Sequence, residues 1–169
     1  MMLLDMEFLT TEKNKRIITF LLRLLAVTAT AVAAAVMATS HEVVHLSTGT
    51  FEAKYTRIPA FTYFVTANVI GSLYGLTVLF IHPEHTFWRF VVGFDVVITL
   101  LLTSAASAAT ETVYLVNEGN SYVRWLPICG HVDSYCSQAE QALVAAFIGV
   151  LIYLILLVYT IFIAISELD

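Results

Sequence analysis

Charged side chains are scarce in this sequence of 169 residues, since Asp, Glu, Lys and Arg together make up only 12% of it. A soluble domain carries about a quarter charged residues, so the composition argues against one. The eight basic residues form no run that could follow a phosphate backbone, and nucleic acid is not an expected partner. With only three prolines, the chain also has few helix breakers.

Apolar residues are abundant instead: 59% of the chain is hydrophobic and the mean hydropathy is +0.85. A helix rises about 1.5 Å per residue, so a run of roughly 20 apolar residues crosses the hydrocarbon core. Helices also satisfy every backbone hydrogen bond within lipid. We therefore predict an all-α, four-helix transmembrane bundle. Residues 1–16 precede a membrane domain of residues 17–165, a tail of residues 166–169 follows it, and the spans are predicted at 17–39, 60–81, 90–112 and 143–165.

Basic residues near the span ends set the predicted orientation. The first span is longer than the 7–15 residues of a cleaved signal and contains Arg23, so we expect an anchor that is retained. A short turn at 82–87 and both termini lie on the cytosolic side (N-in/C-in), and long loops at 40–59 and 110–142 lie outside. This orientation rests on Lys13, Lys15, Arg16 and Arg89 inside against Lys54, Arg57 and Arg124 outside.

Two charged side chains fall inside the predicted spans, Arg23 in the first and Asp95 in the third. Each costs about 2.5–3.5 kcal/mol near the centre of a membrane helix. Both lie about six residues into outward-running spans, hence roughly 8–10 Å deep. Opposite charges at one depth predict an ion pair that fixes helix register. The alternatives are a proton or ion relay, for which Asn68 and scattered Ser and Thr offer few further groups, and snorkelling of Arg23 alone.

Small residues indicate where helices approach closely in lipid. They crowd the first span from Ala26 and the third from Thr103, so we expect the outer halves of these two spans to pack together. The second span contains Gly71-Ser-Leu-Tyr-Gly75, which fits a dimer face or packing within the chain equally well, and Asn68 lies one turn earlier. The fourth span is uncharged and rich in Leu, Ile and Val, and we expect it to face lipid.

The two cysteines, Cys129 and Cys136, fall in the second outer loop. An even number of cysteines on a non-cytosolic face predicts a disulfide. Closing so short a loop would stabilise the chain by roughly 2.5 kcal/mol in the chain-entropy model. Two free thiols, or a metal site formed with His131 and Asp133, are the alternatives.

The run His41-Glu42-Val43-Val44-His45 matches the His-Glu-x-x-His pattern of zinc hydrolases. A catalytic zinc needs a third protein ligand, and the candidates Glu52, His131 and Asp133 have no recognisable spacing. The chain also has no room for a globular domain that could form a cleft. We interpret the run as the polar end of a membrane helix, and expect no catalytic residue, metal or cofactor.

Several of these features together resemble the Casparian strip membrane domain-like (CASP-like) proteins of land plants, relatives of MARVEL-type four-span proteins. The resemblance extends over essentially the whole chain from about Lys15. It rests on Leu-Arg23-Leu in the first span, Pro59-Ala-Phe-Thr-Tyr-Phe-Val-Thr-Ala-Asn68 entering the second, Phe94-Asp95 and the following Ser/Ala-rich run in the third, and Trp125…Cys129…Tyr135-Cys136 in the second outer loop.

The resemblance implies a non-enzymatic plasma-membrane scaffold or barrier protein. Such proteins form homo- and hetero-oligomers in the lipid bilayer, and the best-known of them direct local cell-wall modification, so cell-wall enzymes are further expected partners. Two departures are Tyr135, where a Phe is usual, and residues 46–60, which lack the acidic-aromatic signature of the proteins that build the strip itself. The alternative function is a small ion- or proton-coupled transporter or channel subunit that uses Asp95.

Overall fold

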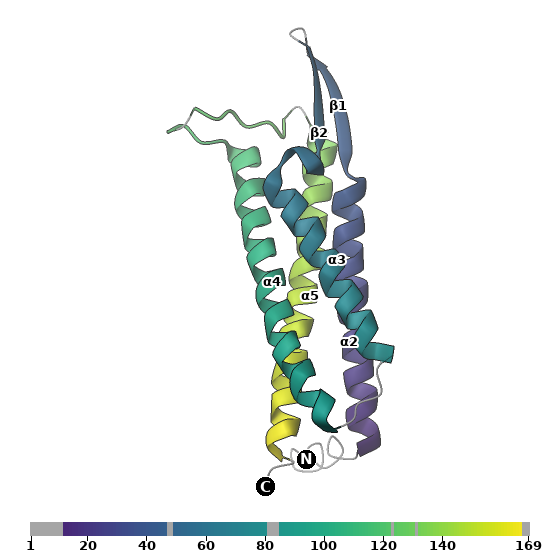
Figure 1. Ribbon diagram of the computed structural model, residues 1–169. Helices are drawn as coiled ribbons and strands as arrows, with labels where there is room; N and C mark the ends of the chain where they lie inside the picture. Colours follow the sequence, from purple (N-terminus) through teal and green to yellow (C-terminus); the bar gives the residue numbers. More distant parts are fainter. Residues whose placement is uncertain (1–11, 47–48, 81–84, 123, 131, 167–169) are drawn as a thin grey trace, which may run out of the picture.

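The computed structural model describes residues 12–46, 49–80, 85–122, 124–130 and 132–166. Four long helices dominate this part of the chain and run up and down in one bundle (Figure 1). All four are long and apolar enough to cross a membrane. The predicted all-α, four-helix membrane bundle is thus confirmed, and its helices are α2 (Glu12–Thr39), α3 (Pro59–Phe80), α4 (His85–Glu118) and α5 (Asp133–Ser166).

The order of the helices around the bundle differs from the predicted one. Helix α2 packs against α3 and α5, and α4 packs against the same two helices, so α2 and α4 lie diagonally opposite each other. The expectation that the small residues of the first and third spans pack together is therefore wrong. Consecutive helices joined by short connections become neighbours in an up-and-down bundle, which leaves the first and third on a diagonal.

Helix α5 is a central packing element, contrary to the expectation that the fourth span mainly faces lipid. It contacts both α2 and α4. Small residues recur at helical spacing along its inner face and admit the neighbouring helices, while aliphatic residues cover the outer face. The buried inner face is formed by Ala139, Ala142, Leu143, Ala146, Val150, Tyr153, Leu156 and Thr160.

The third and fourth helices extend beyond the predicted spans. Helix α4 continues to Glu118 and α5 already begins at Asp133, so the second outer loop occupies residues 119–132 and not 110–142. Beyond Gly93, α4 contains no Gly or Pro until Gly119, which ends the helix with a positive φ of 73° and donates its N–H to Leu115 O at 2.9 Å. At the other end, residues 85–87 of the predicted turn are helical, and residues 82–84 lie outside the described part.

The connection between α2 and α3, which is the predicted first outer loop, contains an antiparallel hairpin of β1 (His41–Leu46) and β2 (Gly49–Lys54). A short 3-10 turn, η1 (Tyr55–Arg57), leads from it to Pro59, the first residue of α3, where a missing N–H is harmless. The hairpin and the loop of residues 119–132 lie at one end of the bundle, opposite the start of α2 and the end of α5 (Figure 1).

Candidate functional site

A polar centre inside the bundle joins side chains from all four helices. Arg23 of α2 and Asp95 of α4 are 2% and 0% exposed, and the structure brings them together across the diagonal. Arg23 Nη1 donates to Asp95 Oδ1 at 3.0 Å and Nη2 to Oδ2 at 2.7 Å. This two-pronged geometry is the strongest that a guanidinium and a carboxylate form.

Tyrosines from α3 and α5 complete the polar centre. The Tyr74 hydroxyl lies 2.8 Å from Asp95 Oδ1 and 3.1 Å from Val91 O, and can donate to either. Its ring lies under the Arg23 guanidinium, 5.9 Å from Cζ to the ring centroid, in cation–π range. Tyr153 of α5 is 1% exposed and donates to Gly71 O on α3 at 2.7 Å. The ion pair is therefore buried, and Tyr74 adds both a hydrogen bond and a cation–π contact to it.

The glycines of the small-xxx-small motif line the inside of the bundle. A Cβ atom added at Gly75 would lie 2.5 Å from Val27 Cγ2 and 2.8 Å from Tyr153 Oη. One added at Gly71 would lie 3.1 Å from Leu102. Helices α2, α4 and α5 thus each place a side chain against this face of α3. The motif was expected to form either a dimer face or a packing surface within the chain, and in the structure it packs within the chain.

Asn68, the other predicted packing residue of α3, is 1% exposed. Its amide donates to Phe64 O one turn earlier at 2.9 Å, and its Oδ1 has no partner among the described residues. It therefore makes its hydrogen bond within its own helix and does not join the polar centre.

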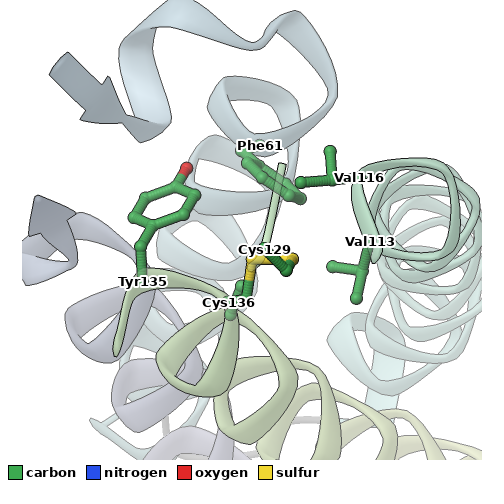
Figure 2. A pocket seen from close by; sticks show the side chains of 7 residues that line it. Phe61, Val113, Val116, Cys129, Tyr135 and Cys136 are labelled. Carbon is green, nitrogen blue, oxygen red and sulfur yellow. A yellow bond between two sulfur atoms is a disulfide. The ribbon is translucent and has the colours of Figure 1, made fainter. Parts of the chain in front are cut away.

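A disulfide between Cys129 and Cys136 ties the second outer loop to the first turn of α5. The two Cα atoms are 5.8 Å apart, an ordinary span for a disulfide. Figure 2 shows the bridge at the wall of a cavity of about 10 Å³ whose lining is apolar. This lining joins the start of α3, the end of α4 and the start of α5, and consists of Phe61, Val113, Val116, Cys129, Tyr135, Cys136 and Ala139.

Tyr135 and Trp125, the two predicted aromatic residues of this region, lie in different environments. Tyr135 is 2% exposed, its ring centroid is 6.2 Å from that of Phe61, and its hydroxyl has no partner in the described part of the chain. Trp125 is 61% exposed, although its backbone is held by two hydrogen bonds to Asn120. The disulfide between Cys129 and Cys136 therefore lies between the exposed ring of Trp125 and the buried ring of Tyr135 along the chain.

The His-Glu-x-x-His run forms strand β1, which corrects the expectation of a helix end. Helix α2 stops at Thr39, and β-branched residues occupy the middle of the run. In a strand, positions 41 and 45 are about 13 Å apart, too far for one zinc ion with bonds of about 2 Å. Glu42 instead accepts a hydrogen bond from the Tyr135 N–H at 3.0 Å, and so caps the first turn of α5.

The proposed third zinc ligands do not gather near this run. Glu52 forms an exposed ion pair with Arg57 at 3.6 Å, Asp133 begins α5, and His131 lies outside the described residues. Within the described ranges, no three His, Cys, Asp or Glu side chains are close enough to hold a metal ion. The alternative of a metal site built on the cysteines has no geometric support, because both sulfurs are used in the disulfide.

Tyr74 and Tyr153 are the functional residues that sequence reasoning missed. Both lie in the middle of apolar spans, where a hydroxyl needs a hydrogen-bond partner. Tyr74 belongs to the Gly71–Gly75 motif that was considered only for its small residues. Tyr74 lies seven residues from the end of its predicted span, close to the depth of Arg23 and Asp95, whereas Tyr153 lies twelve residues from the end of its own span and no such signal marks it.

Comparison with known proteins identifies the family. Residues 12–152 match the family model described as the Casparian strip membrane protein domain. "CASP-like protein 1C2" of Vitis vinifera is 51% identical over 151 residues, which cover 89% of this chain and 94% of the relative. "CASP-like protein 1C1" of Arabidopsis thaliana is 44% identical over 147 residues, or 87% and 90% of the two chains. No solved structure is significantly similar to the chain. With four apolar helices and these plant relatives, the chain belongs to the CASP-like family of multi-pass membrane proteins that carry the Casparian strip membrane protein domain.

Proposed function

We propose that this chain is a non-enzymatic scaffold or barrier protein of the plasma membrane, with both termini in the cytosol. It assembles with copies of itself and with related four-span proteins into membrane platforms. Those platforms then direct local cell-wall modification through cell-wall enzymes at the outer loops. Family membership supports this proposal. The way in which the interior of the bundle fixes its lipid-facing surface also supports it.

The observation that carries the proposal is the closed polar centre. Arg23 uses its two terminal nitrogens on Asp95, and each Asp95 oxygen accepts from Arg23 while one also lies near Tyr74. Groups committed in this way hold three helices, α2, α3 and α4, in one register. A bundle held rigidly from within presents fixed outer faces to neighbouring proteins, as an assembling protein requires.

The polar residues around the centre offer poor support for the transporter alternative. Hydroxyl groups deeper in the bundle donate to backbone carbonyls within their own helices, which satisfies them locally. Thr99, for example, donates to Asp95 O at 2.7 Å and Thr103 to Thr99 O at 2.7 Å. An ion or proton path needs side chains that exchange partners along the membrane normal.

Mobility and cross-linking in the native plasma membrane test the proposal. We expect slow lateral diffusion and cross-linked oligomers for the natural chain. The Asp95→Asn variant should lose both properties. Glu118→Gln is the matched control, because it makes the same chemical change at an exposed position of the same helix, and should behave as the natural chain.

Two results would contradict the proposal. One is a natural chain that diffuses freely as a monomer. The other is an Asp95→Asn variant that assembles normally in reconstituted vesicles and loses an ion flux that the natural chain supports, since this outcome would assign Asp95 to transport. Labelling of the N-terminus from outside intact cells would overturn the orientation alone.

A further inference from the structure

The second outer loop exposes an unusual group of large apolar side chains. We define the aromatic loop as residues 119–122 and 124–128. In it Tyr122 is 97% exposed, Leu126 81% and Trp125 61%. Isolated exposed apolar residues are common on proteins, but three within five positions form a patch that needs a cover.

The aromatic loop holds this patch in a fixed shape. Asn120 and Trp125 exchange two backbone hydrogen bonds of 2.9 Å, and Asn120 Oδ1 accepts from the Tyr122 N–H at 3.0 Å. Ile128 donates its N–H to Val116 O at the end of α4, and the disulfide at Cys129 fixes the far end. The side chains are therefore displayed in advance of binding, which lowers the entropic cost of docking.

Gly119 is the residue that makes this shape possible. It has a φ of 73°, and a Cβ atom there would lie 2.6 Å from Trp125 O. Any other residue would push the two sides of the loop apart. Arg124 also has a positive φ, 56°, and is exposed at the turn.

The placement of the loop indicates what lies beneath it. It runs sideways from the top of α4, beyond the outline of the bundle and not across its end (Figure 1). In a membrane, the space beside α4 is filled by lipid. The patch therefore overhangs the leaflet on this side of the bilayer.

Helix register gives the height of the overhang. Asn117 donates to Glu140 at 3.3 Å, so these positions of α4 and α5 lie at one level. The exposed aliphatic surface of α5 begins four residues deeper at Val144, about 6 Å away. The loop begins two residues beyond Asn117, hence about 9 Å above that surface. The headgroup layer is about 5–8 Å thick, so the side chains of the loop can reach it.

Charge decides which lipids suit this surface. Residues 40–59 and 110–142, which form this end, contain six acidic and three basic residues. A strongly anionic membrane would be repelled by that surplus, whereas a zwitterionic headgroup offers a phosphate to Arg124 without a net charge. Trp and Tyr are also the residues that settle at the level of headgroups.

We propose that the aromatic loop docks on zwitterionic phospholipid headgroups of the adjacent leaflet, with Trp125, Tyr122 and Leu126 inserted at the interface and Arg124 at a phosphate. This contact fixes the height and tilt of the outer end of α4. It is independent of the platform role, because a monomer would dock in the same way.

Tryptophan fluorescence in phosphatidylcholine vesicles tests the docking. The Trp88→Phe variant leaves Trp125 as the single indole of the full chain. Its emission should be quenched about twofold more by lipids brominated near the headgroup end of the acyl chain than by lipids brominated near the methyl end. If that variant does not fold, the difference between the natural chain and Trp125→Phe supplies the same signal.

Variants of the loop provide the controls. Replacing Tyr122 and Leu126 by Ser should shift the Trp125 emission to the red and increase acrylamide quenching. Tyr114→Ser removes an exposed aromatic ring from α4 outside the loop and should change neither signal.

Three outcomes would overturn the docking. The first is acrylamide quenching of Trp125 as strong as in the unfolded chain, without quenching by lipid. The second is shielding that disappears as the lipid-to-protein ratio rises, since the cover would then be a second copy of this chain. The third is shielding that requires anionic lipid.

Discussion

The buried ion pair gives the sharpest prediction for the stability of the bundle. Asp95→Asn keeps the shape of the side chain and removes its charge, leaving Arg23 2% exposed without a counter-charge. Asp95 also lies 2.8 Å from the Tyr74 hydroxyl, a contact that the amide can retain. The substitution therefore isolates the contribution of the charge.

The expected magnitude follows from the geometry of the pair. Removing one partner of a buried ion pair costs about 3–5 kcal/mol, because the other charge is left uncompensated. That loss lowers the folding equilibrium constant by about two to three and a half orders of magnitude. Tyr74→Phe keeps both charges and removes one hydroxyl that donates to the carboxylate, so it should cost less, at the upper end of the range of about 0.6–1.7 kcal/mol measured for hydrogen bonds within membranes. Arg23→Gln should resemble Asp95→Asn.

A double-mutant cycle measures the coupling directly. Unfolding is followed by titration of sodium dodecyl sulfate into mixed micelles for the natural chain, the two single variants and the double variant. We expect the double variant to lose less than the sum of the single losses, since two neutral amides remain and no buried charge is unpaired. Additive losses, within about 0.5 kcal/mol, would refute the assignment of the pair as the clamp of the bundle.

Other predictions test separate parts of the structure. Reduction and alkylation of Cys129 and Cys136 should lower the free energy of unfolding by about 2.5 kcal/mol, and alkylation of the intact protein without reductant would show that the bridge is absent. Gly75→Ala should disrupt the bundle in the detergent titration, because its Cβ would overlap side chains of α2 and α5. The Cβ atom added in Gly93→Ala meets nothing within 4 Å, so this variant should be neutral or stabilising. An equal loss of stability in Gly75→Ala and Gly93→Ala would contradict the packing around Gly75. Glu42→Gln should retain a weaker cap on α5 than the natural carboxylate, seen as modestly faster hydrogen exchange at the first turn, and equilibrium dialysis should detect no stoichiometric zinc in either protein.

The number of helices and the contact between Arg23 and Asp95 followed from simple physical rules. Four long apolar runs leave little choice of fold in lipid. Two opposite charges at one depth have a strong reason to meet. Both arguments depend on the identity and position of residues along the chain, which a sequence states directly.

The neighbours of each helix did not follow from the same rules. Small residues in α2 and α4 show that something approaches closely, but not which helix. The small residues of α5 were overlooked because large aliphatic residues between them dominate its composition. Tyr153 is the clearest case, since its hydroxyl contacts a backbone carbonyl 82 residues away, and no local pattern indicates such a contact.

The first outer loop shows how context changes a motif. The spacing of His41 and Glu42 relative to position 45 suits zinc only when the chain is helical. The strand separates positions 41 and 45, and the carboxylate of Glu42 accepts a hydrogen bond from α5. The strand could be predicted only by considering residues 41–54 as a hairpin, because the β-branched residues at the centre of the run favour a strand only weakly on their own.

The distance along the chain between Arg23 and Asp95 has a consequence for biogenesis. The two residues are 72 positions apart, so at about 5–20 residues per second the ribosome needs about 4–14 s to synthesise the second after the first. During that interval the first helix carries an unneutralised guanidinium, at a cost of about 2.5–3.5 kcal/mol if it enters lipid alone. Pairing with the third helix removes that cost, so we expect the first helix to stay near the translocon until the third one emerges. Truncation of the nascent chain before Asp95 should leave the first helix extractable by alkali, whereas chains released after α4 should resist extraction.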